Sequence, residues 1–240
     1  MAIEFRVGPM AAIAVVLVAA AGCSVERSGD DGASSGSSEG AAAGTSEQAP
    51  SAGSGFVPGP DNEDPSKDIE GVEITEYPVG QHAAPGQRVA YVKAPPDGGA
   101  HDQVWATCNG VVYDTPVRNE HMVHSLEHGA VWIAYDADQV TGEDRQALVD
   151  RVDGQPYLMM SPYPGLDKAV SLQSWGHQLK VDDVDDERID QFIAALRENE
   201  YTTPEPGAPC DSVGPEFDAT NPPPFEAGPP GPGAAPVGGG

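Results

Sequence analysis

Only the middle of this chain has the apolar residues that a hydrophobic core needs. Residues 23–68 consist mainly of Gly, Ser, Ala and acidic residues without an apolar period, which predicts a flexible tether. Residues 211–240 are dominated by proline and glycine, which helices and strands do not tolerate at that density, and this predicts a disordered tail. The sequence therefore confines the fold to residues 69–210, enough for one modest globular domain.

The first 22 residues have the form of an export signal. Their apolar run, AAIAVVLVAA, is too short to span a bilayer and ends in small residues. Cys23 follows directly, which predicts a lipoprotein signal peptide over residues 1–22 and lipidation of Cys23. The alternative is an ordinary cleaved signal with an incidental cysteine. We therefore expect an extracytoplasmic lipoprotein of the cell envelope, anchored to the membrane through Cys23.

The charge of the chain bears on its partners. The formal net charge is −26 at pH 7, so the chain is strongly acidic. Nucleic acids and anionic membrane surfaces are themselves negative and attract basic proteins. We therefore expect no nucleic-acid partner, whereas a protein partner in the cell envelope stays open. The sequence also has no phosphate loop, dinucleotide fingerprint, serine nucleophile motif or CxxC, so nucleotide chemistry, acyl transfer and thioredoxin-type redox chemistry lose support.

Hydrophobic patterning predicts an α/β domain, in which helices pack on a mixed sheet. The clearest strand is the continuous apolar run AVWIAYD, of the kind that lies centrally in a sheet. The other expected strands and hairpins cover 88–95, 111–113, 156–163 and 169–181, and the expected helices cover 120–128, 141–152 and 183–199. We expect one compact domain flanked by disordered tails.

The cysteines predict a cross-link. If Cys23 is lipidated, Cys108 and Cys210 remain, and an even remainder in an oxidising compartment favours a disulfide. Such a bond closes a loop of about a hundred residues, which contributes about 4.7 kcal/mol in the chain-entropy model. The alternative is that Cys108 is a metal ligand beside the histidines.

A histidine cluster is the main candidate for chemistry. The stretch NEHMVHSLEHG contains His121, His124 and His128, and His124, Glu127 and His128 spell H-x-x-E-H. On a helix, His124 and His128 lie one turn apart on one face. Imidazoles at that spacing bind Zn or Cu, and Glu127 can orient a ring or complete the site.

Two loops offer further metal ligands. His101 follows Gly-Gly-Ala, which lets its loop approach closely, and His82 lies in another loop bounded by Gly and Pro. The expected set is His101, His124 and His128, with Glu127, His121 and His82 as further candidates. Copper stays open because thioethers are soft ligands and three methionines lie in the domain, at Met122, Met159 and Met160.

Three functions compete for this cluster. The first is a binding module with a His-rich metal site, which we favour over an enzyme. The second is a metal-dependent hydrolase in which Glu127 is the general base. The third is a structural or partner-binding module whose histidines bond internally to the backbone, without metal.

Several motifs resemble a known family. The stretches VYDTPVRNEHMVHSLEHGAVWIAY, YLMMSPYPGL, SWGHQL and TPEPGAPC resemble the domain of unknown function 3105 family of bacterial exported proteins. The resemblance covers residues 70–210. Two departures occur: Gly-Gly-Ala-His replaces the usual Ser-Gly-Pro-His, and the step from Cys108 to Tyr113 contains Asn109 and an additional Val. The resemblance implies an extracytoplasmic domain, often lipid-anchored, and implies no established activity.

Overall fold

The computed structural model describes residues 55–211 and 217–239. The predicted signal peptide, Cys23 and the predicted tether as far as residue 54 lie outside the described residues. Within the described ranges, no helix has both the length and the apolar character that crossing a bilayer requires.

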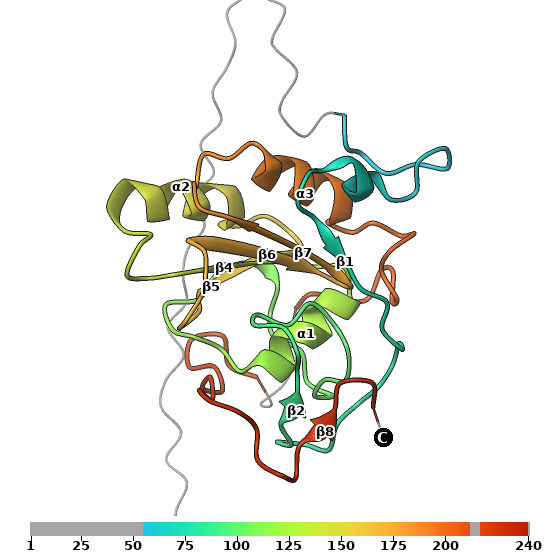
Figure 1. Cartoon of the computed structure of the whole chain (residues 1–240), viewed down its shortest axis with the longest axis vertical. Helices are drawn as coiled ribbons and strands as arrows, with labels where there is room; N and C mark the ends of the chain where they lie inside the picture. The colour runs from blue at the N-terminus through green and yellow to red at the C-terminus, as the bar shows by residue number, and fades with distance from the viewer. Residues whose placement is uncertain (1–54, 212–216, 240) are drawn as a thin grey trace, which may run out of the picture. The chain divides into compact units, whose positions relative to one another are not determined.

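The domain is built on one mixed six-stranded sheet (Figure 1). Its strands are β1 (Glu73–Ile74), β3 (Asn109–Val112), β4 (Val131–Tyr135), β5 (Leu158–Pro162), β6 (Val170–Ser174) and β7 (His177–Val181). They lie in the order β1-β7-β6-β4-β5-β3. β5 runs parallel to both β3 and β4, whereas β6 runs antiparallel to both β4 and β7, and β1 antiparallel to β7. The predicted α/β class with a mixed sheet is confirmed.

Helices cover both faces of the sheet. α2 (Gly142–Val152) and α3 (Arg188–Leu196) lie on one side, and α1 (Asn119–Glu127) lies on the other (Figure 1). The three predicted helices are confirmed, with bounds shifted by a few residues at the ends. A short 3-10 helix, η1 (Pro65–Asp68), precedes β1.

The position of β4 inside the sheet explains its continuous apolar sequence. All five residues of β4 are buried, because successive side chains enter different cores. Val131, Ile133 and Tyr135 pack with residues of α2 and α3. Trp132 and Ala134 pack with residues of α1. β4 therefore fixes α1 against the sheet, and α1 carries most of the histidine cluster.

The predicted strand at 88–95 is wrong for most of its length. Only β2 (Val89–Ala90) is extended into a ladder, and it pairs with β8 (Ala235–Pro236) outside the main sheet. The segment ends in Pro95 and Pro96, which have no backbone N–H to donate and so cannot continue a ladder.

Two segments that the sequence assigns to the tails have contacts with the domain. Residues 217–239 pack on the domain, where Phe217 is buried and the Ala235 N–H donates to the Arg88 carbonyl. At the other end, residues 55–68 also contact the domain, and the Glu63 carbonyl accepts a hydrogen bond from Asn199. A Pro/Gly-rich chain has no internal ladder, so its order here comes from contacts with distant residues, which local composition does not reveal.

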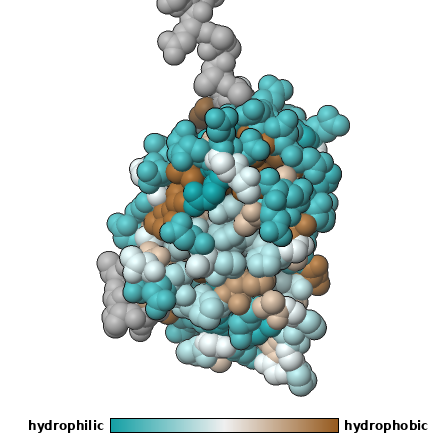
Figure 2. All heavy atoms as spheres, turned by 90° about the vertical axis from the view of Figure 1, so that its left-hand side faces the viewer, coloured by the Kyte–Doolittle hydropathy of each residue, from teal (hydrophilic) through white to brown (hydrophobic). Residues whose placement is uncertain are grey.

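The surface agrees with an acidic composition. In Figure 2, hydrophilic side chains cover much of the visible face, and the apolar patches between them are small and separate. The chain has 38 acidic residues against 12 Lys and Arg, so its surface is strongly anionic.

Cys108 and Cys210 form the predicted disulfide, with their Cα atoms 4.8 Å apart. Both cysteines are buried, and the Cys108 N–H donates to the Cys210 carbonyl. The bond consumes the Cys108 thiol, so in this state Cys108 is not a metal ligand. It ties the segment that follows α3 to the α1 side of the sheet.

Removal of this bond is expected to destabilise the domain. The sequence separation of the two cysteines is 102. Replacing both cysteines by alanine should lower the free energy of unfolding by about 4–5 kcal/mol, because the unfolded chain regains the entropy of that loop. Denaturant titration of both proteins measures the difference, and a reducing agent should affect only the wild type. A loss below about 1 kcal/mol would contradict the expectation.

A buried carboxylate joins η1 to β7. Asp64 accepts a hydrogen bond from the Ser66 hydroxyl at 2.5 Å, and its Oδ2 lies 3.3 Å from His177 Nε2 and 3.4 Å from Lys67 Nζ. Burial by itself raises the pKa of Asp64, but the hydrogen bonds from His177 and Ser66 and the nearby positive charge outweigh it. The pKa of Asp64 therefore lies well below its usual range.

This lowered pKa predicts a pH-dependent stability difference. A carboxyl group with a lowered pKa in the folded state stabilises the fold above its ordinary pKa and loses that effect as the pH falls. Asp64→Asn should therefore lower the free energy of unfolding by about 1.5–3 kcal/mol at pH 7, and the difference should shrink below about pH 4. Urea titrations across pH, with Asp64→Asn compared to the exposed control Asp68→Asn, test this. A deficit that does not change with pH would contradict it.

Candidate metal centre

The second half of α1 faces two loop histidines. His124 and Glu127 are three residues apart and so share one side of the helix. His82 and His101 pair as a parallel bridge between two loop segments, which places both beside the helix. These four residues each offer a ligand atom, and the four atoms lie within 4.8 Å of one another. We call them the inner group.

Two atoms of the inner group are buried without a hydrogen-bond partner. His101 Nε2 and Glu127 Oε2 lie 2.8 Å apart, and both side chains are fully buried. Their contact does not have the angle of a hydrogen bond, and within the described residues neither atom has another partner. The other Glu127 oxygen accepts the Gly80 N–H at 2.7 Å. Buried polar atoms left in this way are costly unless another group satisfies them.

The histidines bond to the backbone through one nitrogen and leave the other free. His101 Nδ1 donates to the Gly99 carbonyl at 2.8 Å, and His124 Nδ1 donates to the Asp102 carbonyl at 2.7 Å. A carbonyl only accepts, so Nδ1 carries the proton and, in a neutral ring, Nε2 keeps its lone pair. These bonds give Nδ1 of each ring a partner within the protein. Proteins also use such bonds to orient histidines that bind metals.

The electrostatics of the inner group suit ligands. Burial, together with the neighbouring His101 and His128 rings, lowers the pKa of His124 to about 3, so its ring is neutral at physiological pH. Burial alone would raise the pKa of Glu127, but the adjacent His101 ring and the hydrogen bond from the Gly80 N–H outweigh it and the net pKa is lowered. The group therefore contains a neutral imidazole and a carboxylate, which are the forms that bind cations.

His128 lies in a different set from the one expected. The structure places it with His124 and Glu205, whose ligand atoms also lie within 4.8 Å of one another. We call these three residues the outer group. His128 Nδ1 donates to the Pro209 carbonyl at 2.8 Å, and its Nε2 lies 3.5 Å from Glu205 Oε2. The expected trio of His101, His124 and His128 is therefore divided between two groups that share His124.

The remaining expected ligands lie elsewhere. His121 belongs to neither group, and its Nδ1 donates to the Val104 carbonyl at 2.6 Å. Met122 and Met159 are buried in the core beneath α1, and Met160 is buried in the core on the opposite face. The two groups thus consist of imidazole nitrogens and carboxylate oxygens.

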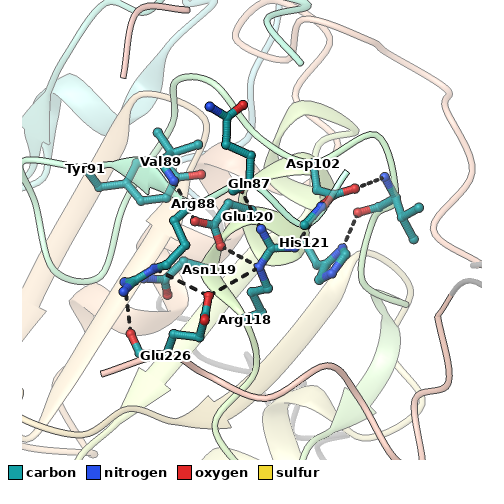
Figure 3. A network of polar contacts seen from close by, with 12 residues as sticks. Gln87, Arg88, Val89, Tyr91, Asp102, Arg118, Asn119, Glu120, His121 and Glu226 are labelled. Carbon is teal, nitrogen blue, oxygen red and sulfur yellow. Dashed lines mark hydrogen bonds and ion pairs between the residues drawn. The ribbon is translucent and has the colours of Figure 1, made fainter. Parts of the chain in front are cut away.

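A buried ion-pair network supports the loop that holds His124 (Figure 3). Arg118 Nη1 lies 2.9 Å from Asp102, and Arg118 Nε lies 3.1 Å from Glu120. The same guanidinium donates to the Gln87 carbonyl at 2.6 Å. Asp102 bonds to Arg118 through its side chain and to His124 through its carbonyl, so the network fixes one ligand of both groups.

Sequence reasoning missed Asp102, Arg118 and Glu205. Asp102 follows His101 directly, and Arg118 directly precedes α1. Their positions beside the histidines are the feature of the sequence that could have indicated a role in the site. Glu205 lies in a Pro/Gly-rich stretch and reaches His128 because its N–H bonds to the Glu127 carbonyl. No local pattern indicates that contact.

Loss of Arg118 is expected to be severe. Arg118→Met leaves the buried Asp102 and Glu120 without their cation and should lower the free energy of unfolding by about 3–5 kcal/mol. The control Lys168→Met removes an exposed ion pair with Asp182 and should cost at most about 1 kcal/mol. Denaturant titration compares the two variants, and equal losses would contradict the role of the buried network.

Comparisons with known proteins agree on the family. The model of a family described as "Protein of unknown function (DUF3105)" matches residues 82–212, more than half of the chain. No curated protein matches the chain, and no solved structure matches it. The matched range contains every residue of the inner and outer groups. The chain belongs to the DUF3105 family of proteins of unknown function.

Proposed function

We propose that this domain binds a divalent transition-metal ion, Zn²⁺ or Cu²⁺, through the inner group. The observation that carries the proposal is the pair of buried atoms, His101 Nε2 and Glu127 Oε2, which have no hydrogen-bond partner among the described residues. A cation between them would satisfy both. Two further ligands, from His82 and His124, lie within the same 4.8 Å set.

The donor set supports Zn²⁺ or Cu²⁺ in particular. Three imidazoles and one carboxylate provide four nitrogen and oxygen ligands, which both ions accept. Cu⁺ prefers thiolate and thioether sulfur, but Cys108 and Cys210 form a disulfide and the three methionines lie in the cores. His82 is the exposed member of the group, so the site reaches solvent on one side.

The alternative without metal accounts for only one nitrogen of each ring. It explains why Nδ1 of His101 and His124 donates to a backbone carbonyl. It does not explain why the Nε2 side of His101 faces a carboxylate oxygen at 2.8 Å without forming a hydrogen bond. Metal binding accounts for both nitrogens.

The hydrolase alternative has less support. A general base needs an oxygen that faces a bound water. One oxygen of Glu127 accepts the Gly80 N–H and the other lies against His101 Nε2, which supports a role as ligand more than a role as base. Four protein ligands also resemble a closed metal site, whereas catalytic zinc keeps a position open for water or substrate. A binding role is therefore the better proposal.

We further propose that the domain acts in the cell envelope as a lipoprotein anchored through Cys23. The apolar run before Cys23 and the acidic, Gly/Ser-rich segment after it support this. The disulfide supports an oxidising compartment.

Metal analysis of the protein tests the proposed function. Residues 24–240 would be exported to an oxidising compartment, purified without a histidine tag and supplied with Zn²⁺ or Cu²⁺. We expect one tightly bound ion per chain, and we expect His124→Ala to weaken binding by at least about 100-fold because it removes a direct ligand.

The control for this experiment is His121→Ala. It removes a histidine of the same helix that lies in neither group, so it should leave the affinity within about threefold. Circular dichroism would establish that each variant is folded. A folded, disulfide-bonded wild type that binds neither ion would refute the proposal.

A further inference from the structure

The outer group is a second set of metal ligands, and like the inner group it has one exposed member. The side chain of Glu205 is 48% exposed, whereas His124 and His128 are buried. Their ligand atoms lie within 4.8 Å of one another. Three protein ligands leave a fourth position of a tetrahedral ion open to water, whereas the four ligands of the inner group fill all four positions.

His124 belongs to both groups but can bind only one ion. Its Nδ1–H donates to the Asp102 carbonyl, so Nε2 is the one nitrogen with a lone pair. An ion held by His124 therefore has either His101 and Glu127 or His128 and Glu205 as its other partners. The ring centroids of His101 and His128 lie 4.6 Å and 4.7 Å from that of His124, so His124 lies between two nearly equidistant neighbours.

The charges of the two groups are matched. Each contains one carboxylate, Glu127 in the inner group and Glu205 in the outer. A divalent ion that moves between them exchanges one carboxylate for another and keeps its imidazole from His124. The ion then has one carboxylate ligand in either group. The move therefore does not require a buried ion without a carboxylate ligand in its final position, which would be costly.

The frame that holds the two groups is continuous. The Glu205 N–H donates to the carbonyl of Glu127, and the Pro209 carbonyl accepts the His128 Nδ1–H. Cys210, the next residue, is fixed by its disulfide to Cys108. The outer group is therefore held in place against the last turn of α1, next to the inner group.

We propose that the outer group is the loading site of the inner group. A divalent ion first binds His128, Glu205 and His124, and then moves inward while His124 stays attached. Glu127, His101 and His82 replace Glu205, His128 and bound water. The same steps in reverse release the ion. This inference rests on the proposed metal binding by the inner group and adds the route by which the ion arrives.

The first test isolates the outer group at equilibrium. The double variant His101→Ala/Glu127→Gln removes two inner ligands, and Zn²⁺ binding would be measured in competition with a chromogenic chelator. We expect one ion to bind at least about 100-fold more weakly than in the wild type, and we expect addition of Glu205→Gln to abolish this residual binding.

The second test measures the rate of loading in a chain with an intact inner group. Glu205→Gln should slow the transfer of Zn²⁺ from the chelator by about tenfold or more and leave the equilibrium affinity within about threefold. Glu205 is half-exposed, so the variant is expected to fold. The control Glu200→Gln removes an exposed carboxylate close to Glu205 in the sequence that is in neither group, so it separates loading from general electrostatic attraction.

The outcomes distinguish this inference from the proposed function. If the wild type binds no Zn²⁺, both fail. If the wild type binds Zn²⁺ but the folded double variant has no residual binding that depends on Glu205, the inner site stands and the outer site is refuted. If Glu205→Gln loads at the rate of Glu200→Gln, the loading role is refuted. Residual binding together with selective slowing by Glu205→Gln supports the inference.

Discussion

The structure depends on the burial of a polar helix. α1 is buried from Glu120 to Glu127, although it carries two acids, two histidines and a serine within that range. A polar helix can be buried only if its polar atoms find partners, because each unsatisfied group is costly. Backbone carbonyls of the loop at 102–106 supply many of these partners: they accept bonds from His121, His124 and Ser125. Between Glu120 and Glu127 the exception is Glu127 Oε2, and this atom together with His101 Nε2 is the basis for the metal proposal.

Links between segments far apart in the sequence hold the loops that lie beside α1. Arg118 binds the Asp102 side chain, the Val237 carbonyl accepts the Ala100 N–H, and β8 pairs with β2. The disulfide ties Cys210, in the segment that contains Glu205, to Cys108. Segments far apart in the sequence thus hold the region around Gly99 and Asp102, whose carbonyls orient His101 and His124. Such support is what a preorganised ligand set requires.

The sequence was informative where structure follows from local pattern. The continuous apolar run of β4, the periodicity of α2 and α3 and the arithmetic of the cysteines predicted features that the structure has. It was uninformative where order comes from distant partners. The segment 217–239 has no periodicity of its own. Residues 91–95 have a strand-like composition but no partner strand, and composition does not reveal whether a partner exists.

The candidate site was also predictable only in part. Helical spacing brings His124 and Glu127 to one side, but no local pattern shows that His128 falls in a set with Glu205 and not with His101.

The central claim is that the inner group is one coordination set. The most direct measurement is a crystal structure of the zinc-loaded domain with anomalous diffraction recorded on both sides of the zinc edge. The account predicts one strong anomalous peak bonded to Glu127 and to the rings of His82, His101 and His124, at about 2.0–2.2 Å. Zinc that lies elsewhere on the acidic surface, with no anomalous peak at the inner group, would contradict it.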